Sequence, residues 1–244
     1  MDFEHNARTQ QYIKKVRKFI DEKIRPAEIQ YFKEIHQRNY GEDWKKWTVS
    51  PLIDDLKQQA KTEGLWNLFL PDTEHGQGLS TIEYAPLAEE MGKSFLAPEI
   101  FNCNAPDTGN MEVLHKYGTA EQKEKWLTPL LNGEIRSAFF FTVPEVTSSD
   151  ATNMQATAII EGDEIVINGK KWWSSGIGHP NCKVIIFMGL SDATANRHSQ
   201  HSMVLVPVNT EGVKIERMLP VFGEYDEPYG HGEVSFTNVR VPIT

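Results

Sequence analysis

Cysteine is scarce in this sequence. Among 244 residues only Cys103 and Cys182 occur, far apart in the chain and outside any Cys-x-x-Cys pair. This usage excludes a disulfide-stapled framework and a cysteine-rich zinc site, and it is typical of reduced thiols in a cytosolic protein. We therefore expect both cysteines to be unpaired.

Positive charge and long apolar runs are also lacking. The chain has 25 Lys and Arg against 34 Asp and Glu, a net charge of −9, which argues against binding to nucleic acid or to an anionic membrane surface. The first residues, MDFEHNARTQQ, have neither the apolar core of a signal peptide nor the composition of a transit peptide. We therefore expect a cytoplasmic protein with no transmembrane segment.

Several cofactor and catalytic motifs are absent or incomplete. Gly176-x-Gly178 begins like the dinucleotide fingerprint GxGxxG, but the third glycine is missing and Pro180 stands where a helix should start. His198 and His201 are close in sequence but have no third ligand nearby, so we expect a solvated loop and no metal site. No GxSxG elbow or Cys/His motif indicates a covalent nucleophile.

Helical signals are abundant up to Gly133. Ser80–Glu83 and Thr119–Gln122 are capping boxes, Pro51 follows a capping Ser50, and Gly133 suits the position that ends a helix. Apolar residues recur at helical spacing along 16–24, 52–60 and 126–131. The acidic pair at positions 89 and 90 is interpreted as a solvated helix face.

Short strands separated by turns take over after Gly133. The predicted strands are 138–142, 157–160, 165–167, 184–188, 203–208, 213–218 and 234–239, and Gly162-Asp163 predicts a hairpin between two of them. We therefore predict an α+β, two-domain protein: an all-helical N-terminal domain over 1–133, then an antiparallel β-barrel or sandwich domain over 134–244.

Two aromatic stretches of the β half stand out. One is Trp172-Trp173-Ser174-Ser175, and the other runs from Phe139 to Asp150 through a proline-broken, hydroxyl-rich loop. Each alone is compatible with a core strand, the second with an Asx-type turn. Together they favour complementary walls of a pocket for a flat cofactor.

At these stretches the sequence resembles the acyl-CoA dehydrogenase family. The matching residues are Thr142-x-Pro144 followed by Ser148-Ser149-Asp150, the segment 168–176 (NGKKWWSSG), and the ending 234–242 (VSFTNVRVP). The helical half agrees through 76–80 (GQGLS) and 87–92 (LAEEMG). The resemblance covers nearly the whole chain.

The resemblance implies an FAD site and an acyl-CoA substrate. An aromatic side chain stabilises a planar ligand by stacking, and hydroxyl donors suit the ring positions where charge collects on reduction. By position in the motifs, the flavin-contacting residues are Phe139, Phe141, Thr142, Trp172 and Ser174, with Ser148 and Ser149 near the phosphates. Because neighbours on a strand point to opposite sides, Trp173 is expected in the core.

The resemblance also implies what this stretch lacks. The family's glutamate base lies in a C-terminal four-helix domain, which should begin where this sequence stops, so we expect a truncated chain that is inactive alone and has no identifiable catalytic residue. Full-length relatives imply FAD-dependent α,β-dehydrogenation of an acyl-CoA thioester, an electron acceptor such as an electron-transfer flavoprotein, and a homo-oligomer. The alternatives are an acyl-CoA oxidase, a flavin monooxygenase, or a non-catalytic remnant that binds acyl-CoA or a partner.

Overall fold

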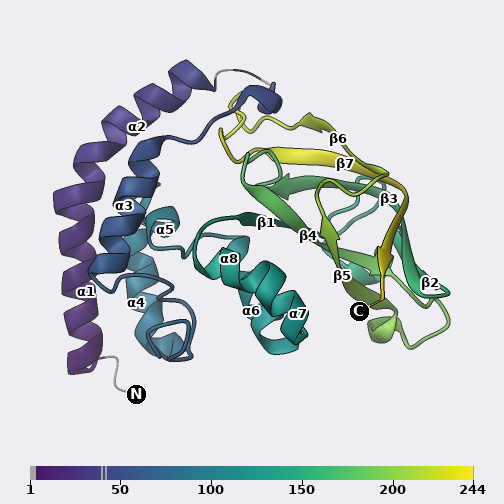
Figure 1. Cartoon of the computed structure of the whole chain (residues 1–244), viewed down its shortest axis with the longest axis horizontal. Helices are drawn as coiled ribbons and strands as arrows, with labels where there is room; N and C mark the ends of the chain where they lie inside the picture. Colours follow the sequence, from purple (N-terminus) through teal and green to yellow (C-terminus); the bar gives the residue numbers. More distant parts are fainter. Residues whose placement is uncertain (1–3, 40, 42, 244) are drawn as a thin grey trace. The chain divides into compact units, whose positions relative to one another are not determined.

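The computed structural model describes residues 4–39, 41 and 43–243 (Figure 1). Contacts group the chain into two compact units: a helical unit, Met1–Arg38 with Val49–Glu112, and a sheet unit, Asn39–Thr48 with Val113–Thr244. The expected division after Gly133 follows the order of the chain, whereas the contacts assign the last helices before Gly133 to the unit that holds the sheet.

The helical unit is built around a long, three-part helix. Its elements are α1 (Ala7–Phe19), the π-helical turn η1 (Ile20–Ile24), α2 (Arg25–Arg38), α3 (Pro51–Thr62), α4 (Thr81–Met91), α5 (Ala97–Ile100) and the first part of α6 (Asp107–Tyr117). Helix α1, η1 and α2 follow one another without a break (Figure 1). The apolar stripe predicted along 16–24 is buried, because Val16, Phe19, Ile20 and Ile24 all lie in the core.

The predicted helix caps are confirmed. At the start of α4, Ser80 Oγ accepts from the Glu83 N–H at 3.4 Å, and a Glu83 carboxylate oxygen accepts from the Ser80 N–H at 2.9 Å. Thr119 and Gln122 make the same reciprocal pair. These bonds satisfy N–H groups that the first turn of a helix leaves without a partner, so short polar motifs fix where these helices begin.

Glu90 on α4 departs from the sequence-based interpretation. It is buried and not solvated, and its carboxylate accepts from Arg17 at 2.6 Å and from Lys93 at 2.9 Å. The hydrogen bond from Arg17 is the main cause that lowers the pKa of Glu90 to about 2, from an ordinary value of 4.5. Charged partners from two segments thus allow a carboxylate to be buried on a helix face.

Replacing Glu90 by Gln should lower the free energy of unfolding by about 1–2 kcal/mol at pH 7, because the ion pairs with Arg17 and Lys93 are lost. The folded pKa is depressed, so the stabilisation is present above pH 4.5 and is lost as the pH falls toward 2. Urea unfolding between pH 7 and pH 3 measures it. The exposed neighbour Glu89→Gln is the control; equal losses for both variants would contradict the assignment.

The sheet unit contains seven strands and several short helical segments. The strands are β1 (Arg136–Phe140), β2 (Thr157–Glu161), β3 (Glu164–Ser175), β4 (Cys182–Leu190), β5 (His201–Pro207), β6 (Val213–Met218) and β7 (His231–Pro242). The helical segments are η2 (Trp44–Lys46), α7 (Ala120–Gln122), η3 (Lys123–Leu127), α8 (Thr128–Leu131), η4 (Ala151–Asn153) and η5 (Arg197–Ser199). All seven predicted strands are present, most of them longer than predicted.

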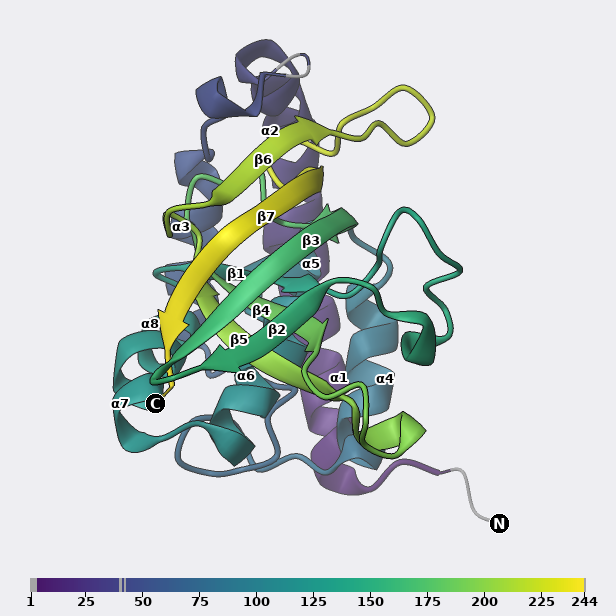
Figure 2. The same ribbon diagram turned by 90° about the vertical axis from the view of Figure 1, so that its right-hand side faces the viewer.

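The strands form one mixed sheet, which corrects the prediction of an antiparallel barrel or sandwich. The order is β1-β4-β2-β3-β7-β6, with β5 also paired to β4, and Figure 2 shows β6, β7, β3 and β2 side by side. Strand β1 pairs with β4 in parallel, with Phe140 opposite Phe187. Apolar alternation shows which residues form strands but not their direction, and β1 and β4 are separated in sequence by the whole β2–β3 hairpin.

The hairpin itself follows the sequence signal. Strands β2 and β3 pair antiparallel, with Glu161 opposite Glu164 across the predicted Gly162-Asp163 turn, and Gly162 has φ 68°. Such a turn favours glycine because a positive φ is unstrained only without a Cβ. One face of the sheet buries a core that includes Phe140, Phe187 and Phe236.

Cys103 and Cys182 are both free, as predicted, and both are buried. Within the described ranges, no helix is long and apolar enough to cross a membrane.

Candidate functional site

The two aromatic stretches singled out in the sequence lie side by side. The N–H of Trp172, near the end of β3, donates to the Thr142 carbonyl at 3.1 Å. The Lys171 ammonium donates to the Phe141 carbonyl at 2.7 Å. The structure therefore brings the predicted segments together, but as hydrogen-bonded neighbours of one surface and not as two walls facing each other.

Phe139 and Phe141 share one side of their segment. Their rings are nearly parallel, with centroids 6.3 Å apart and planes 15° apart, and both side chains are half-buried. Phe140 between them is fully buried and meets Phe236 edge-on at 5.6 Å. Strand alternation thus turns the Phe140 ring into the core, while the half-buried rings of Phe139 and Phe141 lie beside each other and Phe141 also packs against the core.

Trp173 is exposed, which contradicts the expectation that it lies in the core. Strict alternation would place it on the same side as Lys171, whose side chain is fully buried. The pairing of β3 with β7 shifts between Lys171 and Ser174, and Trp173 has φ 52°. This bulge turns the indole outward, with 43% of the residue exposed.

Two polar atoms at the end of β3 are buried without a partner among the described residues: the indole N–H of Trp172 and the hydroxyl of Ser174. Buried polar atoms are nearly always hydrogen-bonded in folded proteins. Unsatisfied donors beside an exposed indole are therefore what a planar ligand with acceptor atoms requires. The residues present fit a flavin ring on these grounds.

His231 also belongs to this site, although the sequence gave no reason to select it. Its Nδ1 lies 2.9 Å from the Ser175 hydroxyl, and its ring lies 6.2 Å from the indole of Trp173. His231 starts β7 directly opposite Ser175 on β3. Only strand pairing could reveal this contact, because the two residues are 56 positions apart.

The polar side chains of the loop after the aromatic segment bind other parts of the loop, and Asp150 also pairs with Arg197 of η5 at 3.0 Å. The Ser148 hydroxyl accepts from the Val143 N–H and donates to the Val143 carbonyl, both at 2.8 Å, whereas Ser149 is exposed. Asp150 accepts from the Thr152 N–H at 3.0 Å, the Asx-type turn that the sequence indicated. Ser148 therefore closes the loop, and Ser149 presents its hydroxyl to solvent.

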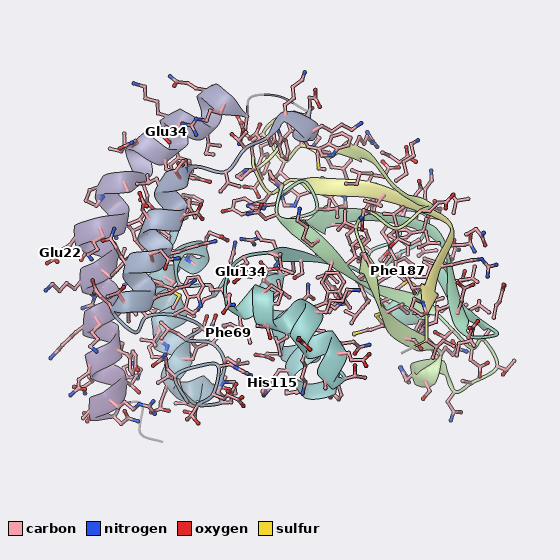
Figure 3. The ribbon with its side chains drawn as sticks, viewed as in Figure 1. Glu22, Glu34, Phe69, His115, Glu134 and Phe187 are labelled. Carbon is pink, nitrogen blue, oxygen red and sulfur yellow. The ribbon has the colours of Figure 1, made fainter. Side chains whose placement is uncertain are left out.

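Lys171 lies beneath this surface without a carboxylate partner among the described residues. Its ammonium donates to the carbonyls of Phe141 and Met188, each at 2.7 Å, and lies 2.9 Å from the Met154 sulfur. It also stands 4.9 Å from the ring of Phe187, the β4 residue labelled in Figure 3. Burial lowers the pKa of Lys171 to about 7.

Two other parts of the sheet unit were candidates for a site: the histidines near η5 and a pocket beside α6. His198 lies in η5 and His201 begins β5, and no group of three metal-ligating side chains occurs within the residues that the structure describes. A pocket of about 300 Å³ lies near the opposite end of β3, between Leu114 and Tyr117 of α6 and residues 203–205 of β5. Its lining is largely apolar and contains no acid–base pair.

Comparison with known proteins gives consistent matches along the whole chain. Residues 6–134 match the model of the acyl-CoA dehydrogenase N-terminal domain, and residues 138–239 match that of the middle domain. Acyl-CoA dehydrogenase family member 11 of Gallus gallus is 52% identical over 99% of this chain and 31% of its own length. This chain thus spans about a third of that curated relative.

Solved structures agree with these matches. A putative acyl-CoA dehydrogenase from Mycobacterium abscessus superposes with a TM-score of 0.93 at 60% identity, over 98% of this chain and 60% of the other. A glutaryl-CoA dehydrogenase from Mycobacterium smegmatis in complex with FADH2 shares the fold, with a TM-score of 0.71 at 19% identity over 98% and 54%. The motifs at the ends of β1 and β3, the fold and these matches agree, and the chain belongs to the acyl-CoA dehydrogenase family.

Proposed function

We propose that this chain provides the flavin-binding surface of an FAD-dependent acyl-CoA dehydrogenase, and that the exposed end of β3 holds the isoalloxazine ring. The observation that carries the proposal is the indole of Trp173, turned outward by a bulge beside the Ser175 hydroxyl and the unsatisfied donors of Trp172 and Ser174. The family membership and the FADH2 complex of a structural relative support FAD as the ligand.

Each residue has a role that its placement suggests. Trp173 supplies a flat apolar contact, Trp172 and Ser174 supply donors toward acceptor atoms of the ring system, and Ser175 adds a hydroxyl that His231 contacts. Phe139, Phe141 and Thr142 continue the surface along the neighbouring segment. Ser148 holds its loop closed, and the exposed Ser149 is the hydroxyl we assign to phosphate contact.

The flavin, when bound, supplies the acceptor for the hydride that leaves the β-carbon of an acyl-CoA thioester. Removal of the α-proton requires a base in the complete protein, and none of the described residues is proposed for that role. An acyl-CoA substrate, an electron-transfer flavoprotein as acceptor and a homo-oligomeric assembly are proposed for the whole protein.

The proposed domains of this chain are 1–133, the helical domain, and 134–244, the domain that carries the flavin surface.

FAD titration of the chain tests this site. Trp173→Ala should raise the FAD dissociation constant about tenfold, because a ring contact of roughly 1.4 kcal/mol is removed. Trp173→Phe retains an aromatic face, so its FAD dissociation constant should rise about threefold or less. Flavin fluorescence quenching measures the constants, and Trp126→Ala on η3 is the control for a half-exposed tryptophan elsewhere in the sheet unit. Wild-type affinity in Trp173→Ala would refute the assignment.

A further inference from the structure

Ser175, His231 and Asp226 lie next to one another and end at the proposed flavin surface. The Ser175 hydroxyl is 2.9 Å from Nδ1 of His231, and Nε2 of the same ring is 3.6 Å from a carboxylate oxygen of Asp226. The His231 side chain is mostly buried, with 22% exposed, whereas that of Asp226 is 59% exposed. One ring nitrogen of His231 therefore faces a hydroxyl, and the other faces a carboxylate.

Backbone hydrogen bonds hold the segments that carry Ser175, His231 and Asp226 in place. The Gly176 N–H donates to the Gly230 carbonyl and the Gly178 N–H to the Tyr229 carbonyl, both at 2.9 Å, which fastens the turn before β7 to the end of β3. Within the turn, the N–H groups of Tyr229 and Gly230 both donate to the Asp226 carbonyl. The contact between Ser175 and His231 thus follows from two strands and a fixed turn, not from a free surface rotamer.

The ring of His231 decides where the hydroxyl proton of Ser175 points. A carboxylate at ion-pair distance from Nε2 favours a proton on that nitrogen over one on Nδ1. If Nδ1 carries no proton, the Ser175 O–H donates to it. If Nδ1 is protonated, it donates to the Ser175 oxygen and leaves the hydroxyl proton free for a ligand. In neither state is the direction of the hydroxyl independent of His231.

We propose that His231, with Asp226 beside its Nε2, is a positioning residue that fixes the direction in which the Ser175 hydroxyl points at the flavin surface. The inference rests on the proposed flavin site. It implies that changes at His231 and Asp226 act on flavin binding through the Ser175 hydroxyl, so that their effects should disappear when this hydroxyl is absent.

A double-mutant cycle on FAD affinity tests the inference. His231→Phe keeps an aromatic ring against Trp173 but removes both nitrogens, and Ser175→Ala removes the hydroxyl. Each should raise the FAD dissociation constant about five- to tenfold, and the double variant should be no weaker than either single one within about twofold. His231→Asn, which can still present a polar atom near the Nδ1 position, should recover most of the affinity.

A second cycle covers the case in which His231→Phe fails to fold. Asp226→Asn changes an exposed turn residue, and it should alter FAD affinity or the absorption spectrum of the bound flavin in the wild-type background but not in Ser175→Ala. Additive effects in either cycle would overturn the inference. The flavin site itself would still stand if the wild type binds FAD and Trp173→Ala binds it more weakly. Absence of FAD binding by the wild-type chain would instead overturn the proposed function, and the inference with it.

Discussion

Lys171→Met is expected to lower the free energy of unfolding of the sheet unit by about 2–4 kcal/mol at pH 7. The ammonium donates to the carbonyls of Phe141 and Met188 at 2.7 Å, and methionine would remove this donor from both. Each hydrogen bond to a charged group contributes about 1.5–3 kcal/mol, partly offset because a desolvated cation is removed as well. Urea unfolding followed by tryptophan fluorescence measures the loss.

The pH dependence of this loss identifies its origin. The folded pKa of Lys171, about 7, lies below its ordinary value of 10.5, so the unfolded chain binds more protons between these values. The wild type should therefore gain stability over Lys171→Met as the pH rises from 7 toward 10, by up to about 1.4 kcal/mol per pH unit. Lys170→Met, at the exposed neighbour, should show no such gain. If the difference in unfolding free energy between the wild type and Lys171→Met does not change with pH, the lowered pKa of Lys171 is wrong.

Gly230→Ala is expected to destabilise the sheet unit by about 3 kcal/mol or more. Gly230 has φ 68°, and an added Cβ would lie 2.7 Å from the sulfur of Met218 and 2.8 Å from the Trp47 ring. Backbone strain and overpacking would then act together, and each contributes about 1–3 kcal/mol. Thermal and urea unfolding report the loss.

Gly162 provides the matched control for this substitution. It also has φ 68°, but an added Cβ would meet nothing within 4 Å. Gly162→Ala should therefore show the strain alone, about 1 kcal/mol. Similar losses for both variants would mean that packing against Trp47 and Met218 contributes nothing. Because Gly230 precedes His231 and binds Gly176, its variant should also weaken FAD binding, whereas Gly162→Ala should not.

The bulge at Trp173 shows where sequence reasoning about the site reached its limit. The motif 168–176 correctly marked the stretch, and strand alternation then assigned Trp172 outward and Trp173 inward. A single residue at φ 52° reverses that assignment for Trp173. Nothing local in the sequence forces this conformation on a tryptophan, which rarely adopts a positive φ, so the surrounding β7 pairing imposes it.

The sequence by itself determined the helical first part and the seven strands, the starts of the helices that Ser50, Ser80 and Thr119 cap, and the family to which the chain belongs. These depend on local spacing, on capping side chains such as Ser80 and Thr119, and on short motifs. Only the tertiary structure decided that β1 runs parallel to β4, that Glu90 and Lys171 are buried, and that His231 meets Ser175. Each of these joins residues distant along the chain, and such contacts are selected by the packing and hydrogen bonding of the whole sheet or helix group, which no local pattern encodes.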